Sequence, residues 1–254
     1  MVHPTTSASS LCPHCGASVG SPVTDLSELE KSPSAHAVRE VFDGNDVFVN
    51  TRDASRFAAF QDGQEPFVTL VTCADSRVAQ SVFNFDPFNR VFEIRDIGNQ
   101  VRPVVGSIDY GVIQLKTPLL MLMGHVRCGA IKAAMGDYSG ETMEIIHALD
   151  DLHLPLREDS GTGDFEDRWL ANVERNVDFQ VNICTRRYRK RIASGELAVL
   201  GVVYDFANLY DRGHGRLVMI NLNGETQPDR IKSNPIVTSL DESVLKATVA
   251  RFTV

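Results

Sequence analysis

The chain has 254 residues, enough to bury a sizeable hydrophobic core in one large domain or two small ones. Hydrophobic residues make up 43% and charged residues 23%, the mix of an ordinary globular protein. The formal net charge of -8 argues against general nucleic-acid binding and against adsorption to anionic membranes, because both depend on positive charge. No apolar stretch approaches the roughly 18 to 20 residues of a membrane-spanning helix, and the start of the chain lacks the features of a secretory signal.

The five cysteines are an odd number in a chain that is large enough to fold without disulfides. This number favours free thiols in a reducing compartment, where they are available for metal binding or redox chemistry. We therefore expect a cytoplasmic protein.

The first 32 residues differ in composition from the rest of the chain. They are rich in Ser, Thr, Pro and Gly and lack long apolar periodicity, so we predict a flexible extension over 1–32. The extension contains Cys12-Pro13-His14-Cys15, and a lone CxxC supplies half a zinc site or a redox pair. Two interpretations stay open for it: incidental exposure, or a four-thiol zinc site shared between two subunits.

Residues 33–254 are predicted to form one α/β domain. Apolar residues recur at helical spacing over 33–60, which predicts two short helices with a break at Asp43-Gly44-Asn45. Short apolar runs that do not alternate are typical of strands buried on both faces of a parallel sheet, and they lie at 67–72, 91–94 and 119–123. Helical periodicity over 104–116 and 130–135 then indicates strand–helix–strand order with right-handed crossovers.

The second half of the chain continues this alternation. In chain order we predict an exposed acidic insertion at 137–165 with a short helix at 143–149, a long helix at 165–192, and strands at 197–204 and 217–222. The turn-forming residues 211–215 join the last two strands as a hairpin, which places the final strand antiparallel at an edge of the sheet. Ser239 followed by Glu242 resembles a capping box for a short C-terminal helix.

Two polar segments directly follow predicted strands. Cys73-Ala74-Asp75-Ser76-Arg77 follows the first strand, and Gly124-His125-Val126-Arg127-Cys128-Gly129 follows the third. Ligands of open α/β sheets bind outside the carboxyl ends of the strands, so we expect both segments at one edge. Thiolate and imidazole are ligands that zinc prefers, and three of them leave a fourth tetrahedral position for water. We therefore predict that Cys73, His125 and Cys128 bind one zinc ion that activates water.

Asp75 and Arg77 add a feature that a purely structural zinc site does not need. A carboxylate two residues from a ligand can accept a hydrogen bond from metal-bound water, and a nearby guanidinium would keep it ionised and oriented. We predict that the two residues form a catalytic pair; the alternative is an ion pair that only caps a helix.

The pattern C-x-D-S-R followed by G-H-x-x-C-G resembles the β-carbonic anhydrase family. Four flanking segments extend the resemblance over residues 35–225: Gln64-Glu65-Pro66, the segment from Phe92 to Asn99, Gly106-Ser107-Ile108-Asp109-Tyr110 and Gly201-Val202-Val203-Tyr204-Asp205. The resemblance implies zinc-dependent reversible hydration of carbon dioxide to bicarbonate and a proton by a zinc-bound hydroxide. It also implies a homodimer or higher homo-oligomer, in which the N-terminal helices grip the partner.

The resemblance assigns roles residue by residue. It implies that zinc is bound by Cys73, His125 and Cys128, and that the catalytic residues are Asp75 and Arg77. It implies a substrate-binding set made of Gln64 as a donor to a substrate oxygen, of Phe92, Ile97 and Tyr110 as walls of a narrow apolar pocket, and of Gly98 and Gly129 as points of close backbone approach. For the four side chains of this set, ordinary packing is the alternative interpretation.

The chain departs from the family pattern at two positions near the predicted site. Asp96 stands where the family carries Asn, which puts the charge near the pocket in question. Leu70 stands where the closed, bicarbonate-inhibited members carry Trp, and the only tryptophan of the chain is Trp169. We therefore expect the open subtype, with Asp75 off the metal.

Two alternatives to carbon dioxide hydration stay open. The same fold and ligands could hydrolyse carbonyl sulfide or carbon disulfide, because substrate choice depends on the shape of the pocket. A zinc-bound protein without catalysis, which binds partners through its N-terminal CxxC, is an alternative of another class.

The run Arg186-Arg187-Tyr188-Arg189-Lys190-Arg191 is strongly basic in an acidic chain. We expect it to form a solvated helix face or to pair with the acidic surface of a partner subunit, not to contact nucleic acid. Cys184, just before it, is expected to be buried within its helix.

Overall fold

The computed structural model describes residues 29–58 and 60–252. The chain divides into two units, Met1–Gln61 and Asp62–Val254. The CxxC at Cys12 to Cys15 and most of the predicted extension over 1–32 lie outside the described residues.

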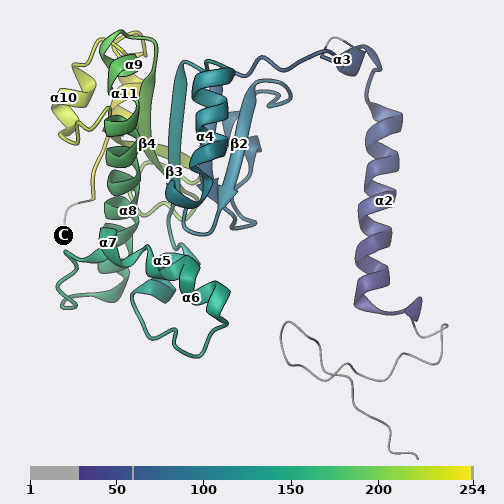
Figure 1. The fold of residues 1–254 in the computed structure, drawn as a ribbon, viewed down its shortest axis with the longest axis horizontal. Helices are drawn as coiled ribbons and strands as arrows, with labels where there is room; N and C mark the ends of the chain where they lie inside the picture. The colour runs from purple at the N-terminus through teal and green to yellow at the C-terminus, as the bar shows by residue number, and fades with distance from the viewer. Residues whose placement is uncertain (1–28, 59, 253–254) are drawn as a thin grey trace, which may run out of the picture. The chain divides into compact units, whose positions relative to one another are not determined.

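The first unit is built around one helix, α2 (Pro33–Thr51), which is followed by the short α3 (Ser55–Ala58) (Figure 1). Ser32 caps α2 with its side chain, and Pro33 takes the first turn, where its missing N–H costs nothing. The predicted break at Asp43-Gly44-Asn45 is wrong, because α2 runs through it. A single exposed glycine weakens a helix by only about 1 kcal/mol, which the rest of a 19-residue helix can offset.

The second unit contains a five-stranded sheet in the order β2-β1-β3-β4-β5 (Figure 1). Its strands are β1 (Val68–Cys73), β2 (Val91–Asp96), β3 (Leu119–His125), β4 (Ala198–Asp205) and β5 (Arg216–Leu222). The first four are parallel, whereas β5 pairs antiparallel with β4 at the edge. The predicted fold class, a mainly parallel sheet with an antiparallel edge strand and flanking helices, is confirmed.

Helices cover both faces of the sheet, which explains why its central strands are apolar without alternation. Every residue of β1 is buried, as are six of the seven residues of β3. On one face the core is formed with α4 (Val105–Asp109), α5 (Gly129–Ala134) and α8 (Phe165–Arg187). On the other face it is formed with α10 (Pro228–Lys232) and α11 (Glu242–Thr248).

The remaining described helical segments are short. They are η1 (Gln80–Phe83), η2 (Arg102–Val104), the π-helical turn η3 (Tyr110–Gln114), α6 (Met143–Asp150), α7 (His153–Leu156) and α9 (Arg189–Ala193). None of the described helices is both long and apolar enough to cross a lipid bilayer.

Two predicted helical features are wrong. The helix expected over 165–192 is interrupted, because the buried Tyr188 leaves helical geometry to place its hydroxyl on the carboxylate of Asp109, 2.8 Å away. The capping box does not form: α11 begins after Asp241, so Ser239 lies outside the helix and makes no cap bond.

Candidate metal centre

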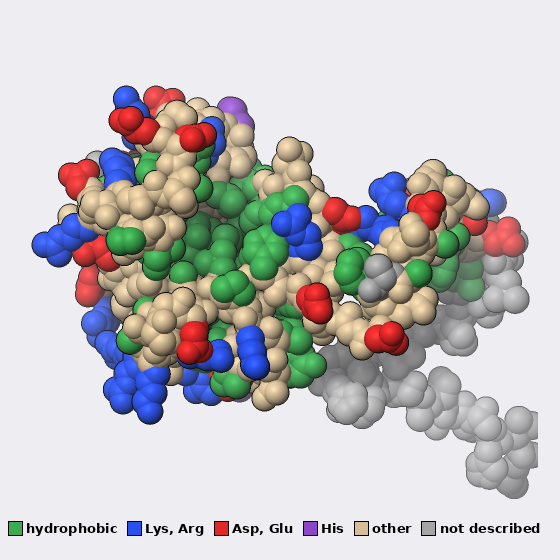
Figure 2. All heavy atoms as spheres, turned by 90° about the horizontal axis from the view of Figure 1, so that it is seen from above, with side chains coloured by type: hydrophobic (Ala, Val, Ile, Leu, Met, Phe, Trp, Pro, Cys, Tyr) green, Lys and Arg blue, Asp and Glu red, His purple; other side chains and the backbone are tan. Residues whose placement is uncertain are grey.

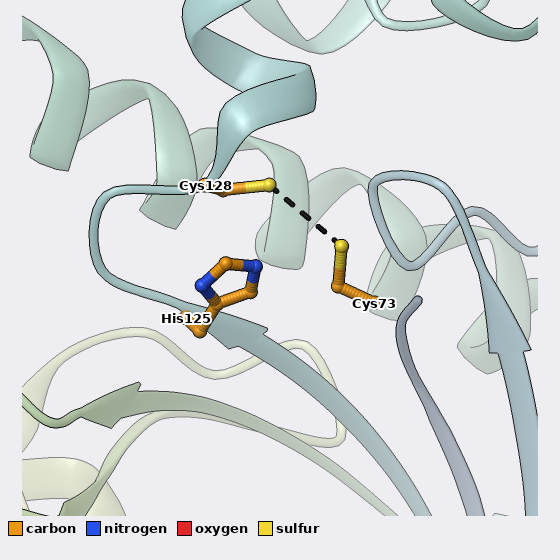
Figure 3. A group of neighbouring side chains, drawn as sticks. All are labelled: Cys73, His125 and Cys128. Atoms are coloured by element: carbon orange, nitrogen blue, oxygen red, sulfur yellow. Dashed lines mark hydrogen bonds between the residues drawn. The ribbon is translucent and has the colours of Figure 1, made fainter. Parts of the chain in front are cut away.

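Three predicted ligands converge at the carboxyl edge of the sheet (Figure 3). Cys73 is the last residue of β1, His125 is the last residue of β3, and Cys128 is the N-cap of α5. Because β1 and β3 are neighbours in parallel register, their ends bring the first two residues together, and the turn after β3 returns the third. All three side chains are buried.

The geometry of these side chains fits a tetrahedral metal ion. The two sulfur atoms of Cys73 and Cys128 are 3.9 Å apart, and all three ligand atoms lie within 4.8 Å of one another. Two sulfurs that each lie about 2.3 Å from a tetrahedral zinc ion would be separated by about 3.8 Å. The observed sulfur pair therefore suits zinc without rearrangement.

The imidazole of His125 is oriented for coordination. Its Nδ1 donates a hydrogen bond to the carbonyl of Val126 at 3.0 Å, which leaves the lone pair on Nε2. That Nε2 is fully buried and has no hydrogen-bond partner among the described residues. Leaving a buried polar atom unpaired costs about 1 to 3 kcal/mol, so an orphan beside two thiols points to a ligand atom.

The two thiols divide one proton unequally. The Cys128 thiol donates to the sulfur of Cys73, and this bond, together with the neighbouring His125, lowers the pKa of Cys73. The same bond and deep burial raise the pKa of Cys128. A divalent cation bound here would take the place of that shared proton, because metal ligation requires both groups as thiolates.

Asp75 and Arg77 form a two-pronged ion pair next to the cluster. The Arg77 guanidinium donates from Nε to Oδ1 at 2.9 Å and from Nη2 to Oδ2 at 2.6 Å. These bonds hold the pKa of Asp75 well below its usual range, so the carboxylate is an acceptor at any physiological pH. Its Oδ2 lies 3.8 Å from Nε2 of His125, which places the acceptor beside the position that a metal would occupy.

The backbone holds this pair in place. Arg77 also donates from Nη2 to the carbonyl of Arg127 at 3.1 Å, within the turn that carries the ligands His125 and Cys128. This bond therefore links the Asp75–Arg77 pair, which follows β1, to the ligand turn, which follows β3.

Phe206 is a site residue that the sequence reasoning missed. Its ring centroid lies 4.8 Å from Cζ of Arg77 and 6.1 Å from the ring of His125, so it contacts both the dyad and a ligand. The buried Asp205 fixes the loop that carries it by accepting backbone hydrogen bonds from the amides of residues 207, 209 and 210. Phe206 directly follows β4, the strand next to β3, and this topological position could have identified it.

Trp169 is a second missed residue. Its indole N–H donates to the carbonyl of Cys128 at 2.9 Å, and the side chain is almost fully buried. The bond anchors the ligand turn to α8. Nothing in the local sequence around Trp169 predicts it, because the contact joins residues from distant elements.

Three of the predicted substrate-binding residues lie toward the amino ends of the strands. Gln64 is exposed and precedes β1, which spans about 16 Å from Val68 to Cys73. Phe92 is paired with Thr69, four residues before the end of β1. Its ring lies 5.8 Å from that of Tyr110, which is 48% exposed. Within one chain, these residues do not meet the metal cluster.

Their neighbourhood is closely packed. A Cβ atom at Gly111 would lie 2.2 Å from Oγ1 of Thr69 and 3.1 Å from the Phe92 ring, so only glycine lets η3 approach β1 this closely. The pair of Phe92 and Tyr110 is therefore held on the sheet by a backbone contact.

The other predicted pocket residues lie at the carboxyl end, as does Asp96. Ile97 follows β2 and is 41% exposed, and Gly98 has a φ of 74°, which favours glycine. At Gly129 an added Cβ would meet no described atom, so packing within one chain does not require glycine there. Asp96 is paired in register with Cys73, and burial raises the pKa of its carboxyl group.

Comparisons with known proteins agree with this geometry. The sequence profile of the carbonic anhydrase family matches residues 68–211, more than half of the chain and all three candidate ligands. The chain belongs to the carbonic anhydrase family. Carbonic anhydrase 2 of Mycobacterium tuberculosis is 31% identical over 180 residues, which cover 64% of this chain and 84% of that protein. The carbonic anhydrase of Mycolicibacterium smegmatis is 28% identical over 193 residues, covering 71% and 93%.

Solved structures place the chain in the β class of carbonic anhydrases, as the motifs predicted. The Coccomyxa β-carbonic anhydrase in complex with acetazolamide is 26% identical with a TM-score of 0.58, covering 88% of this chain and 96% of that one. A tetrameric β-carbonic anhydrase from Sordaria macrospora shares the fold at 22% identity and a TM-score of 0.62, covering 75% and 98%.

Proposed function

We propose that this protein catalyses the reversible hydration of carbon dioxide to bicarbonate and a proton, with one zinc ion per chain on Cys73, His125 and Cys128. The observation that carries the proposal is the Asp75–Arg77 ion pair, in which Oδ2 of Asp75 lies 3.8 Å from Nε2 of His125, an atom with no hydrogen-bond partner among the described residues. A buried three-ligand cluster alone would suit a structural metal, whereas the ionised acceptor beside it suits a reaction.

Zinc on these ligands would lower the pKa of a water molecule at its fourth position and so supply the nucleophile. Two thiolates cancel the charge of the ion, so we expect the activity to rise on the alkaline side of neutral. Asp75 would accept a hydrogen bond from that water molecule and so orient it for attack. Arg77 keeps that acceptor ionised. The half-buried Phe206 ring, which lies against Arg77 and His125, limits the water around the reacting groups.

The chain is proposed to be of the open subtype. Asp75 is engaged by both prongs of Arg77, which leaves no reason for it to bind the metal. Leu70 is fully buried in β1, at the position where the closed members carry Trp.

We further propose that the working enzyme is a homo-oligomer in which a second copy supplies Gln64, Phe92 and Tyr110 to the substrate pocket. Two observations support this. These residues are partly or largely exposed and lie far from the cluster of their own chain, and α2 buries none of its residues. Apolar side chains on one stripe of α2, Val38, Val41, Phe42 and Val49, are each more than half exposed. The related Sordaria enzyme is tetrameric.

Three further assignments go with this function. The free thiols of Cys73, Cys128 and Cys184 suit a reducing compartment, so the proposed location is the cytoplasm. The division into an extension over 1–32 and one catalytic domain over 33–254 stays a prediction. So does the role of the CxxC at Cys12 to Cys15.

The decisive experiment is stopped-flow carbon dioxide hydration by the zinc-loaded protein, run beside assays of carbonyl sulfide and carbon disulfide hydrolysis. Rapid hydration with little hydrolysis is expected. The reverse preference would favour the hydrolase alternative, and zinc-bound protein without any activity would favour a partner-binding role. Zinc counted in the same sample should be one ion per chain; about one and a half would support a shared four-thiol site.

A further inference from the structure

The junction between α8 and α9 borders a hollow of about 430 Å³ that is open to solvent. Its lining combines two apolar walls with five cationic side chains: Ile113 and Tyr188, then Arg186, Arg187, Arg189, Lys190 and Arg191. Figure 2 views the molecule from the end where α9 lies in Figure 1, and it shows Lys and Arg side chains gathered at the lower left. In a chain with a formal net charge of -8, this is a strong local reversal of sign.

Two of the five cations are already neutralised, and they build the frame of the hollow. Arg187 donates to both oxygens of Asp109, with Nε 2.8 Å from Oδ1, and this pairing raises the pKa of Arg187. Arg191 donates to the carbonyl of Val112 at 3.0 Å and lies 3.5 Å from the carboxylate of Glu196. These bonds tie the α8–α9 junction to the α4–η3 segment, so the hollow has a defined shape.

The other three cations of the lining are not neutralised by any described residue. Within residues 29–58 and 60–252, no hydrogen bond or ion pair involves the side chains of Arg186, Arg189 or Lys190. The negative end of the α8 dipole can account for a cation in its last turn, such as Arg186. Arg189 and Lys190 lie just past the end of α8, so the hollow gathers three cations that no described carboxylate neutralises. A bound anion would supply the missing negative charge.

The hollow is separate from the metal centre. Trp169 contacts the ligand turn near the start of α8, and Arg187 ends the helix 18 residues later, about 27 Å away at 1.5 Å per residue. Ligand pockets of proteins have volumes of roughly 300 to 1,000 Å³, and this hollow falls within that range. Ile113 is 44% exposed, so an apolar surface faces the same space as the charges.

We propose that this hollow binds a nucleoside polyphosphate. Arg186, Arg189 and Lys190 take the phosphate groups, since guanidinium and ammonium groups are the usual phosphate partners. The flat base packs against the exposed side chain of Ile113. The proposal does not depend on the reaction at the metal centre.

Isothermal titration calorimetry of the zinc-loaded, full-length protein tests it, with ATP, inorganic pyrophosphate and adenosine as probes. We expect one ATP per chain, weaker binding of pyrophosphate, no measurable binding of adenosine, and affinity that falls as salt is raised. The triple variant Arg186→Gln/Arg189→Gln/Lys190→Gln should lose at least tenfold in ATP affinity. It leaves Arg187 and Arg191 in place, so its melting temperature should match that of the parent protein.

Arg230→Gln/Lys232→Gln in α10 is the matched control, because it also removes exposed cations but lies outside the hollow. The control should bind ATP like the parent protein. Ile113→Ala should weaken ATP binding more than pyrophosphate binding; equal weakening would remove the base from the proposal and leave a phosphate site. No ATP binding at low salt, or equal loss in the triple and control variants, would overturn the proposal. A triple variant that changes the oligomeric state would instead assign the hollow to a subunit interface.

Discussion

The two ends of the sheet differ in how completely one chain builds them. At the carboxyl end, Cys73, His125 and Cys128 are buried, and Asp75 is locked by a two-pronged bond to Arg77. Toward the amino end, Gln64 and Tyr110 are exposed, and the Phe92–Tyr110 pair contacts no ligand of the same chain. The candidate metal centre is thus complete in one chain, whereas the proposed substrate contacts of Gln64, Phe92 and Tyr110 require a second chain.

The largest effect is expected from removing a metal ligand. Cys128→Ser should lose bound zinc and essentially all carbon dioxide hydration, because two ligands cannot replace a three-ligand site. Zinc content by atomic absorption and hydration by stopped flow measure both effects. Cys184→Ala is the matched control, since this thiol is buried in α8 away from the cluster and burial raises its pKa to about 12. Zinc retained in the Ser variant would show that the cluster is not the metal site.

Removing the negative charge of Asp75 should reduce catalysis without reducing zinc binding. Asp75→Asn keeps the size of the side chain but removes its charge, so zinc should stay bound while kcat/KM falls about 100-fold or more. Asp137→Asn, on the surface after α5, serves as the control and should leave both unchanged. Full activity in the Asp75 variant would remove the dyad from the mechanism.

The proposed contribution of a second chain to the substrate pocket can be tested by a substitution in α2. Phe42→Glu places a charge on the exposed apolar stripe of this helix and should shift the protein to smaller species in size-exclusion chromatography with light scattering. If a second copy supplies the substrate pocket, activity per zinc should fall roughly tenfold or more in parallel, while the zinc content stays constant. Glu40→Lys, on the opposite side of α2, is the control. Dissociated protein with full activity per zinc would show that one chain suffices.

The same contrast explains what the sequence could predict. The strands and the three ligands are visible locally, because apolar runs mark buried parallel strands and the ligands directly follow them. Phe206 and Trp169 escape prediction, since each acts through a contact between distant elements. Tyr188 interrupts a predicted helix for the same reason: its bond to Asp109 crosses from α8 to α4. The proposed role of Gln64 and Tyr110 depends on contacts with a second chain, which local patterns in one sequence do not describe.

A smaller effect on activity is expected from a substitution of Phe206, beside the metal centre. Phe206→Leu keeps an apolar wall but removes the ring face beside Arg77, a contact worth about 0.5 to 2 kcal/mol. We expect kcat/KM to fall several-fold, mostly through kcat, with zinc content unchanged. Phe206→Tyr keeps the ring and should restore most of the activity. Equal losses in the Leu and Tyr variants would mean that the ring face does not position Arg77.

The smallest effect on activity is expected at Asp159, which ties the 137–165 insertion to α8. Its carboxylate accepts both prongs of Arg168 at 2.9 Å and a bond from Asn172 at 2.7 Å, and these bonds hold its pKa well below the usual range. Because the folded pKa is lowered, this stabilisation is fully present above the unfolded value of about 3.9 and is lost as the pH falls through the folded value. Asp159→Asn should therefore cost about 2 kcal/mol at pH 7.

Urea unfolding at pH 7 and at pH 3 checks the sign. The difference in unfolding free energy between parent and variant should shrink at the lower pH, and hydration by the zinc-loaded variant should stay within twofold of the parent. A difference that does not change with pH would assign the loss to packing instead of charge. A loss of activity without a loss of stability would mean that the insertion acts on the metal centre directly. The site at the carboxyl end of the sheet would then include residues beyond the strand ends.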